Sequence, residues 1–256
     1  SPDKIETREN AAGLDLNRDF IKLDSPEIRY LVRILDAWNV DILFDAHTTN
    51  GSLHRYDLTY DIPHNPAASR ALDSWPRQDL LPTVTKKLEE VNIPTFYYGN
   101  FSRDYQQWES FGHEPRYSTE YMGLLGKIGI LIESYSYTTF QRRIHATYNF
   151  IDQSMEYLCA NHVKVKKLLD TPEADDSLVS IQGRIVADGQ QYLARGYAYK
   201  NEDNKTDTAR SPHRFPSPRD KDHLEILDEK DYEVELLNMG HPVLKVQPPE
   251  YYYVPY

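Results

Sequence analysis

Two short apolar runs constrain the fold of this chain more than any other feature. Residues 40–46 read VDILFDA and residues 128–133 read IGILIE. Runs of this length, rich in branched aliphatic side chains, are typical of buried parallel strands and are short for buried helices. Helical patterns occupy much of the chain around them. The sequence therefore predicts an α/β fold with a mixed, mostly parallel sheet flanked by helices.

Helix signals are clearest after Ser25. Ser25 suits an N-cap, Pro26 suits the first helical position, and apolar residues then recur every three or four positions. The same criteria predict the other elements of the first part of the chain. The predictions are helices over 26–38, 80–91 and 139–169, a strand over 95–98, and a long loop with room for one short helix over 51–76.

The pattern changes after residue 170. Residues 171–176 (TPEADD) are typical of an acidic linker, and alternating apolar and polar residues follow it. We therefore predict an α/β part over 1–170, a linker over 171–176 and a small β-rich region over 177–256. Within that region, residues 200–222 are charged and contain several prolines, which predicts a mobile loop.

Charge and composition exclude several classes of protein. The chain has 256 residues and a net charge of −11, which disfavours nucleic acid and anionic membranes as partners. No run approaches the roughly 18 apolar residues that a membrane span needs. Cys159 is the single cysteine, so an internal disulfide and a cysteine-based zinc cage are both excluded.

The first candidate site is Asn17-Arg18, at the end of a short apolar run. Arg presents a planar fork that matches a carboxylate, and Asn can hold a carboxylate oxygen beside it. The alternative is a surface loop with an ordinary Arg–Asp pair, which the spacing alone favours about two to one.

The second candidate site is His47, directly after the first apolar run. Ligands of open α/β sheets bind at the carboxyl ends of the strands, and neutral imidazole is a good zinc ligand. The neighbouring Asp45 would fix the tautomer of such a histidine. A hydrogen-bonded histidine in a turn at the strand end is an equally good interpretation.

The third candidate site is Glu133, which ends the second apolar run. A partly desolvated carboxylate at this position is suited to act as a general base on a metal-bound water. The alternative is an acidic residue that interacts with the dipole of a following helix.

In chain order, the three candidate sites resemble the later half of the zinc carboxypeptidase (carboxypeptidase A-like) family. The resemblance rests on the motifs NRDF at 17–20, FDAH at 44–47 and ILIE at 130–133. It covers about residues 8–160. The proline-aromatic stretch over 248–255 is also similar to the tail of some bacterial members.

The resemblance implies a role for each matched residue. Asn17 and Arg18 would bind the terminal carboxylate of the substrate, with Arg18 also counted as catalytic. His47 would be the third zinc ligand, and Glu133 would be the general base that deprotonates a zinc-bound water.

The family also has a mobile tyrosine that closes over the substrate. Tyr117 and Tyr121 are the candidates here, and Arg116 is an alternative cationic contact; the residues alone do not decide among the three.

The chain departs from the family in its zinc ligands. The family takes its first two ligands from a His and a Glu three residues later, upstream of the Asn-Arg pair. None of the nine histidines here is followed by Glu at the third position. His54 and His64 follow His47 in the next loop, but two solvated loop histidines are the better interpretation of them. We therefore expect an incomplete domain, with the missing ligands in an upstream part.

The predicted function is that of a zinc metallocarboxypeptidase that removes C-terminal residues from peptides. One alternative is a non-catalytic relative that binds carboxylates, and another is an N-acyl amino acid deacylase of the aspartoacylase and succinylglutamate desuccinylase type. The expected partners are a peptide or acylated amino acid with a free carboxylate and the missing part of the same domain. Localisation is open, with an extracellular or periplasmic protein compatible with the sequence.

Overall fold

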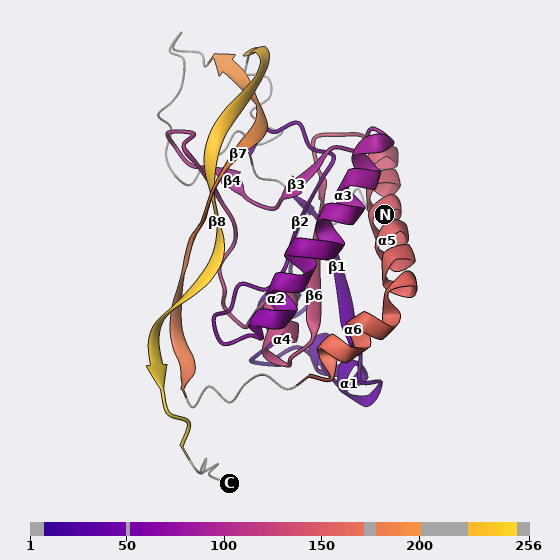
Figure 1. The fold of residues 1–256 in the computed structure, drawn as a ribbon, viewed down its shortest axis with the longest axis vertical. Coiled ribbons are helices and arrows are strands. Elements are labelled where there is room, and N and C mark those ends of the chain that lie inside the picture. Colours follow the sequence, from indigo (N-terminus) through magenta and orange to yellow (C-terminus); the bar gives the residue numbers. More distant parts are fainter. Residues whose placement is uncertain (1–7, 50–51, 172–177, 201–224, 250–256) are drawn as a thin grey trace.

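The computed structural model describes residues 8–49, 52–171, 178–200 and 225–249 (Figure 1). Helices and strands alternate through the first part, and two long strands follow it. The described helices are the 3-10 turn η2 (Leu16–Arg18), α1 (Pro26–Ala37), α2 (Arg70–Trp75), the π-helical turn η3 (Pro76–Leu80), α3 (Leu81–Glu90), α4 (Ser118–Leu124), α5 (Phe140–Ala160) and α6 (His162–Leu169). The strands are β1 (Ile42–Thr49), β2 (Leu58–Asp61), β3 (Thr95–Tyr97), β4 (Asn100–Phe101), β5 (Gln107–Glu109), β6 (Ile128–Tyr135), β7 (Val179–Lys200) and β8 (Glu225–Val246).

The main sheet is built around the two strands that the apolar runs predict. Its order is β1-β6-β2-β3, and β1 pairs with β6 in parallel. β2 pairs antiparallel with β6 and parallel with β3, so the sheet is mixed. The α/β class with flanking helices is confirmed. The prediction of a loop over 51–76 is wrong at residues 58–61, which form β2. This four-residue strand is buried on both faces and includes polar residues, so its sequence shows neither an apolar run nor an alternation of apolar and polar residues.

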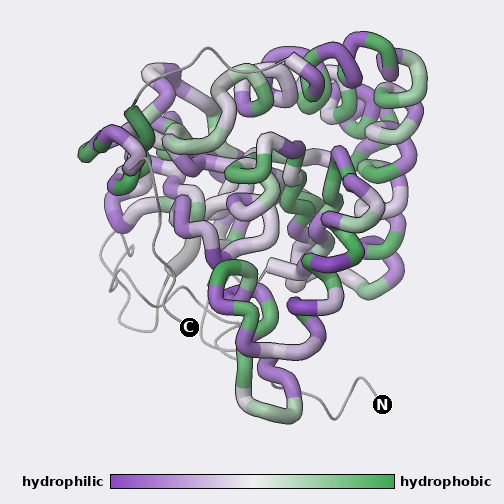
Figure 2. The backbone as a smooth tube through the Cα atoms, turned by 90° about the horizontal axis from the view of Figure 1, so that it is seen from below, coloured by the Kyte–Doolittle hydropathy of each residue, from purple (hydrophilic) through white to green (hydrophobic). Residues whose placement is uncertain are grey.

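One face of the main sheet carries the larger core. Alternate side chains of β6, Ile128, Ile130 and Ile132, are buried against α3 and α5, which lie side by side (Figure 1). In Figure 2 the hydrophobic segments gather at the middle of the molecule and alternate with hydrophilic ones along the surrounding helices. This core holds β1 and β6 in place.

The other face of the sheet packs against α4. An added Cβ at Gly129 in β6 would lie 2.7 Å from both Cα and O of Thr119 in α4, so only glycine permits this approach. Because side chains alternate along a strand, Leu131 and Glu133 lie on the same face as Gly129. Glu133 therefore lies on the face that α4 covers.

The helix predicted over 139–169 is wrong in one respect, since it divides into α5 and α6 at Asn161. Asn161 leaves the helical conformation with φ −114° and ψ 16°. Its side-chain amide donates to the carbonyl of Tyr157 at 2.8 Å, which satisfies a terminal carbonyl of α5. Asn favours such helix ends because its short polar side chain competes for backbone hydrogen bonds.

The strands β7 and β8 form the long hairpin at one side of the main sheet in Figure 1. The β-rich prediction agrees with these strands. β8 also pairs in parallel with β5, so the hairpin shares the second sheet, β4-β5-β8-β7, with residues of the first part. The predicted linker over 171–176 and loop over 200–222 fall almost wholly outside the described residues.

In the described part of the chain, no helix combines the length and apolarity required to cross a membrane.

A Gly129→Ala variant tests the close approach of α4 to β6. The added methyl group meets backbone atoms of Thr119, which cannot rotate away, so we expect the free energy of unfolding to fall by about 1–3 kcal/mol. Urea unfolding measures this loss. Lys86→Ala, at an exposed position of α3, is the control and should change it by less than about 0.5 kcal/mol. Equal stability of the two variants would contradict the packing described here.

Candidate functional site

His47 and Glu133 lie opposite each other at the carboxyl ends of neighbouring strands. They are register partners in the parallel pairing of β1 with β6. Partners in a parallel pair project to the same face, which here is the face that α4 covers. The two side chains therefore lie beside each other at one edge of the sheet.

Asn17 and Arg18 reach the same place from the N-terminal segment. Asp15 caps the short turn η2 by accepting from the backbone N–H of Asn17 at 3.1 Å. Downstream of the turn, the backbone N–H of Phe20 donates to the carbonyl of Arg116 at 3.3 Å, and the Phe20 side chain is buried. These contacts hold the Asn-Arg pair beside the beginning of α4.

Asp45 is the centre of a hydrogen-bonded cluster. Its Oδ2 atom contacts His47 Nε2 at 2.9 Å and accepts from the hydroxyl of Ser118. Asn17 Nδ2 lies 3.5 Å from the same oxygen and 3.1 Å from His47 Nε2. The hydrogen bond to Asp45 raises the pKa of His47 despite burial. Burial opposes ionisation of Asp45, but the bonds from His47 and Ser118 outweigh it and lower its pKa.

Glu133 has the opposite environment. Burial raises the pKa of its carboxyl group to about 7, with the charge of His47 opposing the rise and that of Asp45 adding to it. Its Oε2 atom is buried and has no hydrogen-bond partner in the described part of the protein. A buried carboxyl with a pKa near neutrality and a free oxygen is suited to exchange protons.

Arg18 is half-buried and carries a cation without a carboxylate partner. Its guanidinium lies 4.5 Å from the centre of the Tyr117 ring and donates to the carbonyl of Asn17 at 2.6 Å. Across the described ranges, no carboxylate lies within ion-pair distance of it. The charge of Arg18 lowers the pKa of Glu133, and both charges affect the pKa of Tyr98, so the three groups lie within electrostatic reach of one another. Arg18 is thus available to an anionic ligand.

The remaining predicted residues lie at different distances from this cluster. Tyr117 belongs to it through Arg18. Arg116 is exposed, pairs with Glu114 at 3.4 Å and donates to the Tyr117 hydroxyl at 3.2 Å. Tyr121 packs on Phe20 with ring centres 5.7 Å apart.

Sequence reasoning missed Tyr98 and Ser118. Tyr98 directly follows β3, and its pKa is raised by burial and by the charge of Glu133. Tyr98 ends the strand predicted over 95–98, so attention to polar side chains at the carboxyl ends of predicted strands would have selected it. Ser118 begins α4, whose seven residues show no helical periodicity in the sequence.

The prediction that His54 and His64 are solvated is wrong, because both are buried. His54 stacks on Tyr135 with ring centres 4.3 Å apart, and its Nδ1 accepts from the backbone N–H of Tyr56 at 3.2 Å. His64 Nε2 lies 3.2 Å from Asp61 Oδ2 in the interior. Aromatic and polar partners supplied by distant segments bury these histidines, and the local sequence does not indicate them.

A zinc ion is not accommodated by the described residues on their own. Catalytic zinc takes three protein ligands. His47 Nε2 is occupied by Asp45 and Asn17, and the described ranges contain no group of three or more His, Cys, Asp or Glu side chains placed to hold a metal. The expected zinc therefore requires ligands from elsewhere.

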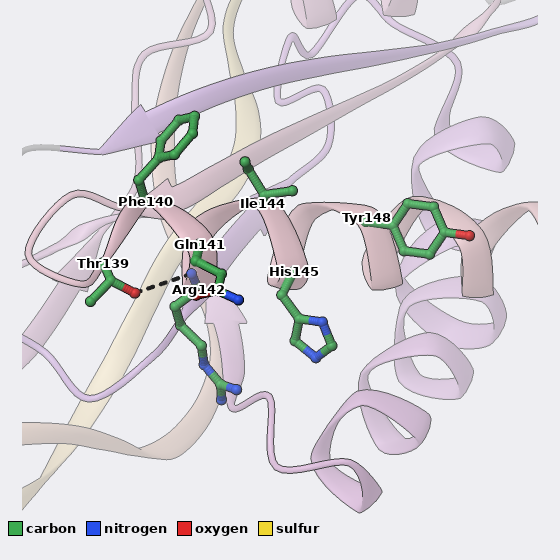
Figure 3. A pocket seen from close by; sticks show the side chains of 7 residues that line it. All are labelled: Thr139, Phe140, Gln141, Arg142, Ile144, His145 and Tyr148. Carbon is green, nitrogen blue, oxygen red and sulfur yellow. Dashed lines mark hydrogen bonds between the residues drawn. The ribbon is translucent and has the colours of Figure 1, made fainter.

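A shallow pocket lies away from this cluster, at the beginning of α5 (Figure 3). In Figure 3 the side chains of Phe140, Ile144 and Tyr148 project from successive turns of the helix. Arg142 also lines it, but its guanidinium is engaged by Asp57 and by the carbonyl of Asn92. No charged group comparable to Arg18 or Glu133 is left free there, so the Asn17–Glu133 cluster is the better candidate.

Comparison of the chain with models of protein families, with curated proteins and with solved structures finds no match.

The pH dependence of stability tests the burial of His54. Burial lowers the pKa of His54 to about 3, whereas an exposed imidazole titrates near 6.5. Between these values the unfolded chain binds a proton that the folded chain does not. We therefore expect this residue to lower the free energy of unfolding by about 1 kcal/mol for each pH unit below 6.5.

Urea unfolding of the wild type and a His54→Asn variant at pH 7, 6, 5 and 4 measures this contribution. Asn keeps an acceptor for Tyr56 but does not titrate, so the stability difference between the two proteins should shrink as the pH falls. The same substitution at the exposed His145 is the control. A difference that stays constant with pH would show that His54 is not buried as described.

Proposed function

We propose that this protein is a hydrolase that cleaves the terminal amide bond of a peptide whose last residue has a free carboxylate. The observation that carries the proposal is the buried carboxyl group of Glu133, which has a pKa of about 7 and an oxygen without a partner among the described residues. It lies within electrostatic reach of Arg18, a cation to which the described ranges offer no carboxylate partner. The order of motifs shared with zinc carboxypeptidases supports the same function.

Arg18 and Asn17 would bind the substrate carboxylate. Arg offers two parallel N–H donors, which match a carboxylate, and a charge-assisted hydrogen bond is stronger than a neutral one. The Tyr117 ring under Arg18 holds the guanidinium plane in place. A ligand whose carboxylate is replaced by an amide would lose this interaction.

Glu133 would act as general base and then as general acid. Its carboxylate takes a proton from the water that attacks the carbonyl carbon. As the C–N bond breaks, the same proton passes to the leaving nitrogen. The products are a shortened peptide with a new carboxylate and a free amino acid. A group with a pKa near 7 can both take and release the proton at neutral pH.

His47 would contribute one ligand if the active protein contains zinc. The other two would come from outside the described residues, and binding through Nε2 would require Asp45 to give up its contact. Calorimetric titration of the wild type and of a His47→Ala variant with zinc chloride measures whether such a site forms.

Selective binding of carboxylates tests the role of Arg18. We expect the protein to bind N-acetyl-leucine at least about tenfold more tightly than N-acetyl-leucinamide, because a hydrogen-bonded charge contributes about 1.5–3 kcal/mol. Arg18→Ala should abolish this preference in calorimetric titrations. Arg29→Ala is the control, since Arg29 is exposed on α1 and donates to the carbonyl of Leu23. Equal affinity of the wild type for both ligands would contradict the proposed substrate.

The role of Glu133 is tested by hydrolysis of an N-acylated dipeptide in zinc-containing buffer. Glu133→Gln should lower kcat by about 10²- to 10⁴-fold. In the wild type kcat/KM should rise with pH through about 7, because the base must be ionised.

Glu120→Gln is the control for this experiment. Burial also raises the pKa of Glu120 to about 7, but its carboxyl group accepts from the backbone of His64 and Asn65 instead of facing the site. This variant should retain activity. Unchanged activity of Glu133→Gln would refute the catalytic role.

A second candidate function is that of a carboxylate-binding protein without catalysis. The 2.9 Å contact of His47 Nε2 with Asp45 favours it, because this contact gives Nε2 a hydrogen-bond partner without a metal. Carboxylate-selective binding together with absence of hydrolysis in the presence of zinc would identify this function.

A further inference from the structure

The orientation of the Asn17 side chain is set by a residue of α4. The backbone N–H of Ser118 donates to Asn17 Oδ1 at 3.2 Å. Because a backbone N–H can only donate, the carbonyl oxygen of the Asn17 amide must face α4. The NH₂ group then faces His47 Nε2, 3.1 Å away. Asn17 thus directs its donors toward Asp45 and His47, at the side of the cluster where a ligand anion would compete with Asp45 for them.

Ser118 makes a second contact with the same cluster. Its hydroxyl donates to Asp45 Oδ2, the oxygen that also contacts His47. Ser118 is only 2% exposed, so water does not compete for these bonds. One residue therefore determines both the direction of the Asn17 amide and the position of the carboxylate beside it.

We propose that Ser118 is a positioning residue for carboxylate recognition and acts through Asn17. If the Asn17 amide turned over, its oxygen would face the site and would repel a ligand carboxylate. The inference rests on the proposed function, because it takes the ligand to be an anion held by Arg18 and Asn17. It adds α4 as the element that determines whether Asn17 turns its NH₂ group or its oxygen toward the ligand.

The backbone at the beginning of α4 permits a sharp test. Ser118 is the first residue of the helix, and Tyr117 before it has φ −84° and ψ 144°. Residues before proline prefer this extended region, and proline is favoured at the first helical position. Ser118→Pro therefore removes the N–H donor and the hydroxyl with little change of the backbone. Ser118→Ala removes only the hydroxyl.

The experiment measures the affinity of the purified protein for N-acetyl-leucine and for N-acetyl-leucinamide by calorimetry. We expect the ratio of the two affinities to fall about fivefold or more in Ser118→Pro and by a smaller factor in Ser118→Ala. If Ser118 had a merely structural role, its replacement would lower the affinity for both ligands equally and leave the ratio of the affinities unchanged. The thermal midpoint of each variant is measured alongside.

The outcomes separate this inference from the proposed function. A wild type that binds both ligands equally overturns the proposed function and the inference with it. If the wild type prefers N-acetyl-leucine and Ser118→Pro keeps the same ratio of affinities, the inference is overturned but the proposed function is not. If Ser118→Pro does not fold, Asn17→Asp decides, because it keeps an acceptor for the Ser118 N–H and places an oxygen where the NH₂ group was. A fall in the ratio supports the inference, and an unchanged ratio overturns it.

Discussion

The parallel pairing of β1 with β6 is the constraint on which the rest of the structure depends. It places His47 opposite Glu133, and a slip of one residue would move one of them to the opposite face of the sheet. The buried isoleucines of β6 hold this register on one face. On the other face, the absence of a side chain at Gly129 allows α4 to approach the sheet closely, which brings Ser118 against Asp45. Core packing and site geometry therefore depend on the same pair of strands.

The site that results has two unlike halves. Around Asp45 the polar groups satisfy one another, and the pKa of the aspartate is lowered while that of His47 is raised. Glu133 is buried with an oxygen that has no described partner, and Arg18 has no carboxylate partner among the described residues. Stability alone would not favour a buried carboxyl oxygen, or a half-buried cation, that the described residues leave without a partner of this kind. Such a combination is expected where a ligand completes the interactions.

Much of this arrangement was predictable, and the exceptions have physical causes. The apolar runs predicted β1 and β6, and the polar residues after them led to His47 and Glu133. β2 escaped prediction because it is short and buries Thr59 and Asp61 as well as apolar residues. The burial of His54 and the role of Ser118 depend on partners more than 60 residues away in the chain, so no local pattern indicates them.

The central claim is that Asn17, Arg18 and Glu133 form one binding site for a carboxylate ligand. Titration of the isotopically labelled protein with N-acetyl-leucine, followed by amide and guanidinium NMR signals, tests it most directly. The account predicts that the largest shifts belong to residues 17–18, Tyr98, Tyr117 and the end of β6. Shifts confined to the pocket at the beginning of α5, with none at Arg18, would contradict it.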